Sequence, residues 1–163
     1  MDKFKALSDK IISGDSLTKK IALWRFKNYK IVFTNGCFDI LHRGHVEYLC
    51  KAASYGDVLI VGLNSDASVR NIKGESRPVQ DEKSRALILA SLQYVTVVVL
   101  FDEDTPYNLI KQVQPDVLVK GADYNPEEIV GYDIVSAKGG EVVTIDLVEG
   151  HSTTNILNKI SKE

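Results

Sequence analysis

Two histidines, His42 and His45, stand three residues apart with Gly44 between them. The apolar run at residues 31–33 predicts a short buried strand before them, and the apolar spacing after them predicts a helix. The start of a helix presents free backbone N–H groups and the positive end of the dipole, which favour anions. Imidazoles donate hydrogen bonds to phosphate oxygens, and glycine lets a phosphate approach the backbone. This spacing therefore predicts a loop that holds a nucleotide triphosphate.

Two other interpretations of the histidine pair stay open at this point. A zinc site needs further ligands, and the H-E-x-x-H spacing is absent, so we expect no metal held by the chain itself. The two histidines are also compatible with a solvated surface. The glycine patterns G-x-G-x-x-G and G-x-x-x-x-G-K-[ST] are both absent, which disfavours a nicotinamide enzyme or an ordinary ATPase.

Hydroxyl and cationic side chains elsewhere suit the same chemistry. Ser152, Thr153 and Thr154 are typical of a helix start, where they either cap the helix or form a second phosphate cradle. Lys73 and Arg77 lie in the Gly-, Ser- and Pro-containing stretch 71–80, which predicts a mobile loop beside the site. These cations are either solvated or close over the triphosphate and neutralise its charge.

The apolar pattern predicts the frame that positions these groups. Further apolar runs occur at residues 57–63, 95–101, 116–120 and 141–145, and amphipathic stretches occupy 66–71, 81–92, 105–113, 126–137 and 153–161. Short apolar strands that alternate with helices are typical of a parallel sheet covered on both faces. We therefore predict an α/β fold with a single Rossmann-like, doubly wound parallel sheet of five strands.

Polar residues cluster where these predicted strands end. Right-handed crossovers place the carboxyl ends of the strands at one edge, where open α/β sheets bind ligands. We expect two groups of side chains to line that edge. Thr34 and Lys120 would contact phosphate, and Asn64, Asp66, Arg77, Gly121 and Asp123 would contact the substrate, with Asp123 accepting hydrogen bonds from sugar hydroxyls. Arg85 either pairs with Asp81 or Glu82 or points at phosphate.

The N-terminal residues predict two helices ahead of the first strand. Phe4, Leu7, Ile11 and Ile12 have helical spacing within residues 3–13, and a second short helix contains Leu17. We expect both helices to pack as an N-terminal appendage. The predicted division is a helical extension at 1–28 and an α/β domain at 29–163.

Composition narrows the class of protein. An apolar fraction of 44%, a charged fraction of 26% and a net charge of −2 over 163 residues are ordinary for a globular protein. The net charge argues against a dedicated nucleic-acid binder, and we find neither a secretory signal nor a membrane-spanning run. Cys37 and Cys50 give no disulfide framework and no metal spacing. We expect a cytoplasmic protein with reduced thiols that binds neither nucleic acid nor membrane.

The segment from Gly36 to His45, with H-x-G-H at 42–45, resembles the nucleotide-binding loop of the cytidylyltransferase-like nucleotidyltransferase superfamily. Five segments in order resemble the D-glycero-β-D-manno-heptose 1-phosphate adenylyltransferases more narrowly: TNGCFDILHRGHVEYL, VGLNSDASVRNIKGESRPV, DEDTP, PDVLVKGADY and GGEVVTID followed by STTN. The resemblance runs from about residue 30 to the C-terminus and leaves out the N-terminal helices. Since no kinase half accompanies it, it implies the stand-alone form.

The resemblance implies transfer of AMP from ATP to heptose 1-phosphate, which gives ADP-heptose and pyrophosphate for surface glycans such as lipopolysaccharide. It implies catalytic roles for His42, His45 and Lys73, and Mg²⁺ that bridges the phosphates largely through water. Folds of this kind commonly dimerise, so we expect a homodimer. The implied nucleotide and phosphate contacts are Thr34, Asn35, Gly36, Cys37, Phe38, Gly44, Lys120, Ser152, Thr153 and Thr154.

Two alternatives remain beside this assignment. Glycerol-3-phosphate cytidylyltransferases share H-x-G-H, but they usually carry an arginine where this chain has Leu147, which weakens the cytidylyl interpretation. The choice of adenine over cytosine for this chain comes from the resemblance and not from the physical chemistry of its residues. The other alternative is a nucleotide-binding domain without turnover, against which His42, His45 and Lys73 all argue.

Overall fold

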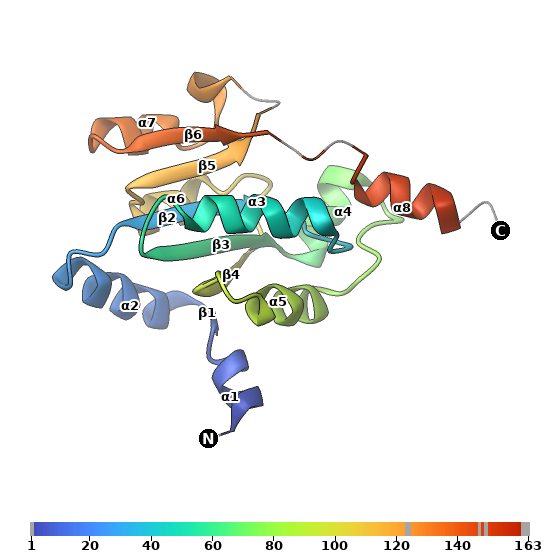
Figure 1. The fold of residues 1–163 in the computed structure, drawn as a ribbon, viewed down its shortest axis with the longest axis horizontal. Helices are drawn as coiled ribbons and strands as arrows, with labels where there is room; N and C mark the ends of the chain where they lie inside the picture. Colours follow the sequence, from blue (N-terminus) through green and yellow to red (C-terminus); the bar gives the residue numbers. More distant parts are fainter. Residues whose placement is uncertain (1, 123–124, 147, 149, 161–163) are drawn as a thin grey trace.

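A computed structural model describes residues 2–122, 125–146, 148 and 150–160 of the chain. Within this part the sheet has six strands, all parallel, in the order β1-β4-β3-β2-β5-β6 (Figure 1). Parallel strands bring their carboxyl ends to one edge. The strands are β1 (Ile11–Ile12), β2 (Ile31–Gly36), β3 (Val58–Asn64), β4 (Val97–Phe101), β5 (Val117–Gly121) and β6 (Glu141–Ile145).

The sequence predicted five strands, and the sixth is β1. Its two isoleucines were expected in a helix, but the helix α1 (Lys3–Ser8) ends earlier and β1 pairs with β4, with Ile11 opposite Val98. The Lys10 ammonium donates to three backbone carbonyls between residues 90 and 95, which holds this turn against the body of the fold. Long-range pairing therefore overrides the local helical spacing.

Besides the shorter α1, the helices differ from the predicted pattern in two places: α4 extends to Lys73, which was predicted to lie in the loop 71–80, and one predicted helix is broken. The stretch 126–137 was expected to be one helix, but it consists of the 3₁₀ turn η1 (Pro126–Glu128) and α7 (Tyr132–Ala137). Between them Gly131 has φ +93°, and a Cβ there would lie 2.7 Å from the Ile110 Cδ1. The remaining helices are α2 (Gly14–Phe26), α3 (Arg43–Ala53), α4 (Asp66–Lys73), α5 (Glu82–Ser91), α6 (Tyr107–Val113) and α8 (Thr153–Ile160).

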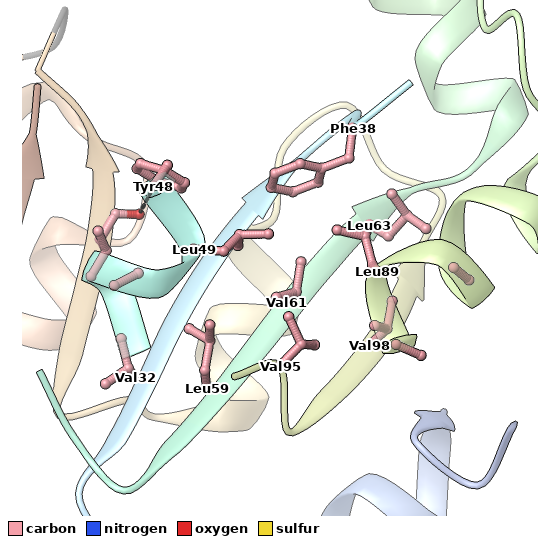
Figure 2. Close-up of a cluster of buried hydrophobic side chains, with 14 of the residues drawn as sticks. Val32, Phe38, Tyr48, Leu49, Leu59, Val61, Leu63, Leu89, Val95 and Val98 are labelled. Atoms are coloured by element: carbon pink, nitrogen blue, oxygen red, sulfur yellow. Dashed lines mark hydrogen bonds between the residues drawn. The ribbon is translucent and has the colours of Figure 1, made fainter. Parts of the chain in front are cut away.

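Helices cover both faces of the sheet, as predicted. Successive strand residues point to opposite faces, so Val32 packs in one cluster with Leu49 of α3 and Leu89 of α5 (Figure 2). Its neighbour Phe33 packs in the other cluster with Ile110 of α6. The N-terminal region contributes to this second cluster, because Leu17 and Trp24 of α2 are also buried there.

The strand order fixes where a ligand site forms. From β2 the chain builds outward through β3 and β4 on one side, and then through β5 and β6 on the other. Open α/β sheets bind ligands at such a switch point, beyond the carboxyl ends of the strands. The loop that leaves the end of β2 leads to His42, the N-cap residue of α3, and His45 lies in the first turn of that helix. Among the described residues no helix has the length and apolar character to cross a membrane.

Candidate functional site

The rings of His42 and His45 are stacked at the start of α3. Their centroids lie 3.8 Å apart with 22° between the planes, and Phe38 meets the His45 ring edge-on at 5.2 Å. His42 is the N-cap residue, but its side chain makes no capping hydrogen bond. Both Nδ1 atoms are buried and, like Asn35 Oδ1, have no hydrogen-bond partner in the described part of the chain. Buried polar atoms are rarely left unpaired, so these atoms indicate a place for a ligand.

Burial sets the charge of this pair. It lowers the pKa of His45 to about 4, with a further decrease from His42, while the Ile40 backbone acts in the opposite direction. Burial also lowers the pKa of His42, and His151 adds to this effect. At neutral pH both imidazoles are therefore neutral before a ligand binds. The negative charge of a phosphate raises the pKa of a nearby imidazole and favours hydrogen-bond donation to it.

Gly44 brings the start of α8 close to the histidine pair. A Cβ at Gly44 would lie 3.1 Å from His42 Nδ1 and 3.4 Å from the Cβ of His151. In Figure 1 α8 begins beside the first turn of α3. The three histidines of the chain thus come together here, although His151 lies more than a hundred residues away in the sequence.

Ser152, Thr153 and Thr154 lie at the beginning of α8, as the sequence predicted. Ser152 Oγ accepts a hydrogen bond from the Asn155 N–H at 3.1 Å, which is the capping role. Thr153 is half-buried and Thr154 is exposed. The hydroxyls therefore stand at a helix start next to the histidine loop, where capping and anion binding are compatible.

The loop between β2 and α3 has an uncommon backbone conformation. Phe38 has φ +42°, in the left-handed region that side chains rarely adopt, and its ring is buried. A Cβ at Gly36 would lie 3.0 Å from the Phe38 ring, so the absence of a side chain there lets the ring fold back. Cys37 between them is half-buried and unpaired in any disulfide.

Asp39 is a residue of this site that the sequence did not single out. Its carboxylate is buried and accepts hydrogen bonds from Arg77 Nε at 2.5 Å and from the Val79 and Gln80 amides at 2.9 and 3.0 Å. Burial alone would raise the pKa of Asp39, but these hydrogen bonds outweigh it and lower the pKa. Arg77, predicted to contact substrate, is thus ion-paired, and the predicted mobile loop is anchored in its second half.

Arg85 is a structural residue rather than a phosphate ligand. Its side chain is fully buried and donates to the backbone carbonyls of Cys37, Asn64 and Gln80, and to Asp66 Oδ1 at 2.8 Å. Neither of the partners considered from the sequence, Asp81 and Glu82, accepts these bonds. Arg85 therefore connects the ends of β2 and β3 and uses one carboxylate oxygen of Asp66, which was predicted to bind substrate.

Thr34 and Asn64 face the interior instead of the ligand edge. The Thr34 hydroxyl is fully buried and lies 2.7 Å from the Tyr48 hydroxyl, which donates to the Val119 carbonyl. The Asn64 amide is buried and donates to Ser68 Oγ at 2.9 Å. Their side chains were expected to contact a ligand; in the structure these polar atoms join strands to helices, and ligand contact by the two residues stays a prediction.

Cations surround Cys37. Burial raises the pKa of the Cys37 thiol, while Lys73, Arg85 and Arg77 each act to lower it. Lys73 is the last residue of α4, is exposed, and makes none of the hydrogen bonds or ion pairs found among the described residues. It is therefore the cation of this group that is available to a phosphate.

The remaining predicted site residues lie around β5. Lys120 and Gly121 end this strand, opposite Thr144 and Ile145 of β6, and both are half-buried. Asp123 and Leu147, which the sequence analysis also named, lie outside the described residues. Within the described part no three His, Cys, Asp or Glu side chains gather as a metal site.

The site residues that the sequence missed differ in how they could have been found. Asp39 lies inside the motif-bearing loop, and a carboxylate in an apolar context is a signal for a buried ion pair. Gln80 carries no such signal, because its place depends on backbone contacts with Asp39 and Arg85.

A model of the family described as cytidylyltransferase-like matches residues 33–158, from within β2 to within α8. The chain belongs to the cytidylyltransferase-like family. This confirms the resemblance that the H-x-G-H loop indicated. The matched segment includes the histidine pair, Asp39, Lys73 and the start of α8.

Named relatives of this cytidylyltransferase-like chain include bifunctional proteins. It is 56% identical over 155 residues to the bifunctional protein HldE of Rhodopseudomonas palustris, covering 94% of this chain and 32% of the relative. It is 58% identical over 151 residues to the bifunctional protein HldE of Geobacter metallireducens, and this match covers 93% of this chain and 31% of the relative. The chain thus spans about a third of the length of these relatives.

Solved structures agree with this family. A lipopolysaccharide core biosynthesis protein from Thermoplasma volcanium is similar with a TM-score of 0.64 and 30% identity, covering 74% of this chain and 99% of that protein. The pantoate-beta-alanine ligase from Francisella tularensis, in complex with beta-gamma ATP and beta-alanine, is similar with a TM-score of 0.58 and 19% identity. It covers 94% of this chain and 78% of the ligase, and at this identity it shows the fold alone.

Proposed function

We propose that the chain is a sugar-1-phosphate adenylyltransferase that converts ATP and D-glycero-β-D-manno-heptose 1-phosphate into ADP-heptose and pyrophosphate. The observation that carries the proposal is the stacked pair His42 and His45 at the start of α3, with two buried nitrogens that have no partner among the described residues. The family membership supports the heptose assignment, and so does the sequence identity of 56% and 58% to two proteins named HldE.

The reaction needs positioning and charge stabilisation more than a nucleophilic side chain. An oxygen of the sugar phosphate attacks the α-phosphorus of ATP, a new P–O bond forms, and the bond between the α-phosphorus and the bridging oxygen breaks. Pyrophosphate leaves with the bonding electrons. Negative charge grows on the phosphate oxygens during this step, so fixed hydrogen-bond donors and cations lower the barrier.

The described residues supply such groups from three elements. His42 and His45 would donate to the oxygens of the α- and β-phosphates, and the free N–H groups of α3 would add to this. Lys73, exposed at the end of α4, and the hydroxyls that begin α8 would hold the departing pyrophosphate. Because Gly44 keeps α3 and α8 close, these groups act on one triphosphate.

Magnesium would enter with ATP as part of the substrate. Mg²⁺ prefers oxygen ligands and keeps several waters, so phosphate oxygens satisfy most of its coordination. The donors next to the histidine pair are nitrogens and hydroxyls, which suit phosphate oxygens better than a hard cation. The role of the chain is then to orient the phosphates that carry the metal.

Pyrophosphate release tests this proposal. The protein is mixed with Mg²⁺, one nucleoside triphosphate and one phosphate ester, with ATP and CTP crossed against heptose 1-phosphate, other sugar 1-phosphates and glycerol 3-phosphate. We expect release with ATP and heptose 1-phosphate, and formation of ADP-heptose by mass. Turnover only with CTP and glycerol 3-phosphate would replace this function by cytidylyl transfer, and silence with every pair would leave a nucleotide-binding domain without turnover.

A further inference from the structure

The side chain of Gln80 carries a polar atom that the described residues leave without a hydrogen-bond partner. Its Oε1 is buried and has no hydrogen-bond partner in the described part of the chain. The backbone of the same residue is held on both sides: its N–H donates to Asp39 Oδ1 at 3.0 Å, and its carbonyl accepts from Arg85 Nε at 3.0 Å. Both partners are buried side chains, so the Gln80 backbone is placed firmly while its carboxamide oxygen has no partner among the described residues. An unpaired buried amide is costly unless a ligand satisfies it.

The surroundings restrict what that ligand group can be. Lys73, the last residue of α4, and Arg77, which is paired with Asp39, bring positive charge to the segment before Gln80, and positive charge suits phosphate oxygens. A carboxamide oxygen repels a phosphate oxygen and needs a donor instead. A hydroxyl group both donates and accepts hydrogen bonds, so it can pair with either the oxygen or the nitrogen of the Gln80 carboxamide. The chemistry at Gln80 therefore matches the hydroxyl-bearing part of a phosphate ester.

Strand order separates Gln80 from most of the proposed nucleotide contacts. The loop with Gln80 connects α4 to α5 and follows β3, which lies on one side of β2. Lys120 ends β5, on the other side of β2, and the segment with Ser152 follows β6 beyond it. Apart from Lys73, which would reach the departing pyrophosphate from the end of α4, the proposed triphosphate contacts come from the end of β2 and from its β5 side, so we place the acceptor sugar on the β3 side.

We propose that Gln80 binds a hydroxyl group of the sugar 1-phosphate and so helps to select the acceptor. This inference rests on the proposed function. It adds a specificity-determining residue outside the H-x-G-H loop and outside the hydroxyl-rich segment at residues 152–154. Arg77 and Asp39 act as its support, because their ion pair fixes the loop from which Gln80 projects.

Steady-state kinetics of Gln80→Met test the assignment, since methionine has a similar volume and cannot form these hydrogen bonds. The KM for heptose 1-phosphate should rise about 3- to 10-fold, as expected for one lost neutral hydrogen bond, while the KM for ATP stays unchanged. A panel of monodeoxy heptose 1-phosphates identifies the hydroxyl: one analogue should be a poorer substrate for the original chain but lose nothing further in the variant. Gln93→Met, at an exposed glutamine, is the matched control and should behave like the original chain.

Each other result rejects the assignment. A rise in the KM for ATP alone would place Gln80 against the nucleotide. Unchanged constants, or deoxy effects that simply add in the variant, would make the residue structural. If the original chain releases no pyrophosphate with any sugar 1-phosphate, the proposed function fails and this inference with it; an active chain with an unaffected variant rejects only the inference.

Discussion

Asp39 and Arg77 form an ion pair, with 2.5 Å between the carboxylate Oδ2 and Nε. This pair joins the loop between β2 and α3 to the loop that follows α4. The carboxylate side chain is only 1% exposed and also accepts from two backbone amides. The pair joins residues 38 positions apart in the sequence, so it fixes the distance between two segments that we propose bind phosphate.

Replacing this carboxylate should affect both stability and activity. Asp39→Asn leaves Arg77 without its partner, and we expect a loss of about 2–3 kcal/mol in the free energy of unfolding, measured with urea. Turnover should fall as the loop loosens. The control is Asp9→Asn, which removes an exposed ion pair with Lys5 and should change stability little. Equal effects of the two substitutions would contradict a supporting role for Asp39.

The histidine pair should dominate the chemistry. His45→Ala should lower kcat about 10²- to 10³-fold, by analogy with the removal of one transition-state donor, while circular dichroism stays unchanged. Because the rings are stacked, the loss in a variant without both histidines should be less than the product of the single losses. Near-full turnover of His45→Ala would remove this residue from the mechanism.

The low pKa of His45 predicts acid sensitivity of the fold. Burial lowers this pKa to about 4, whereas an unfolded histidine titrates near 6.5. The unfolded state therefore binds more protons between these values, so the stability from this group is complete above about pH 6.5 and is lost as the pH falls toward 4. Between pH 7 and pH 5 the loss should be about 1.5–2 kcal/mol.

A neutral variant isolates this contribution. His45→Gln carries no titrating ring, so its urea unfolding energy should decrease less between pH 7 and pH 5 than that of the original chain. Parallel pH profiles of the two proteins would show that His45 titrates normally. Binding of ATP to the original chain should in turn take up protons over the same range, which calorimetry in buffers of different ionisation enthalpy measures.

Lys73 should act on turnover more than on acceptor binding. It is the exposed cation at the end of α4, and its charge is most useful when the leaving pyrophosphate gains negative charge. Lys73→Ala should lower kcat at least about tenfold, with a smaller change in the KM for the sugar 1-phosphate. Lys51→Ala, at an exposed residue of α3, is the control. If Lys73→Ala leaves rate and binding of both substrates intact, Lys73 is a solvated surface residue.

The substitution Gly44→Ala should lower activity without lowering stability. Alanine generally stabilises a helix interior relative to glycine, but a Cβ here would lie 3.1 Å from the His42 ring and force that ring to move. Gly44→Ala should therefore keep its melting temperature and lose about 10- to 10²-fold in kcat/KM, because small displacements of positioned groups are costly. Unchanged kinetics would mean that the His42 position is not critical.

Local patterns in the sequence were sufficient for most of the frame. Five apolar runs predicted β2 to β6, because buried parallel strands are short and continuously apolar. The pair His42 and His45 stood out through its spacing around Gly44, at a point where a strand ends and a helix starts. These features depend on residues that are close in the sequence, so the pattern of apolar residues indicates them directly.

Only the tertiary structure decided which polar groups are free. Strand β1 exists because β4 offers an edge to pair with, and Thr34 faces inward because Tyr48 meets it there. Whether a polar side chain is satisfied by the protein or left for a ligand depends on partners far away in the sequence. Arg77 is bound to Asp39, whereas the Gln80 side-chain oxygen has no partner within the part of the chain that the structure describes, and that contrast arises only when the chain is folded.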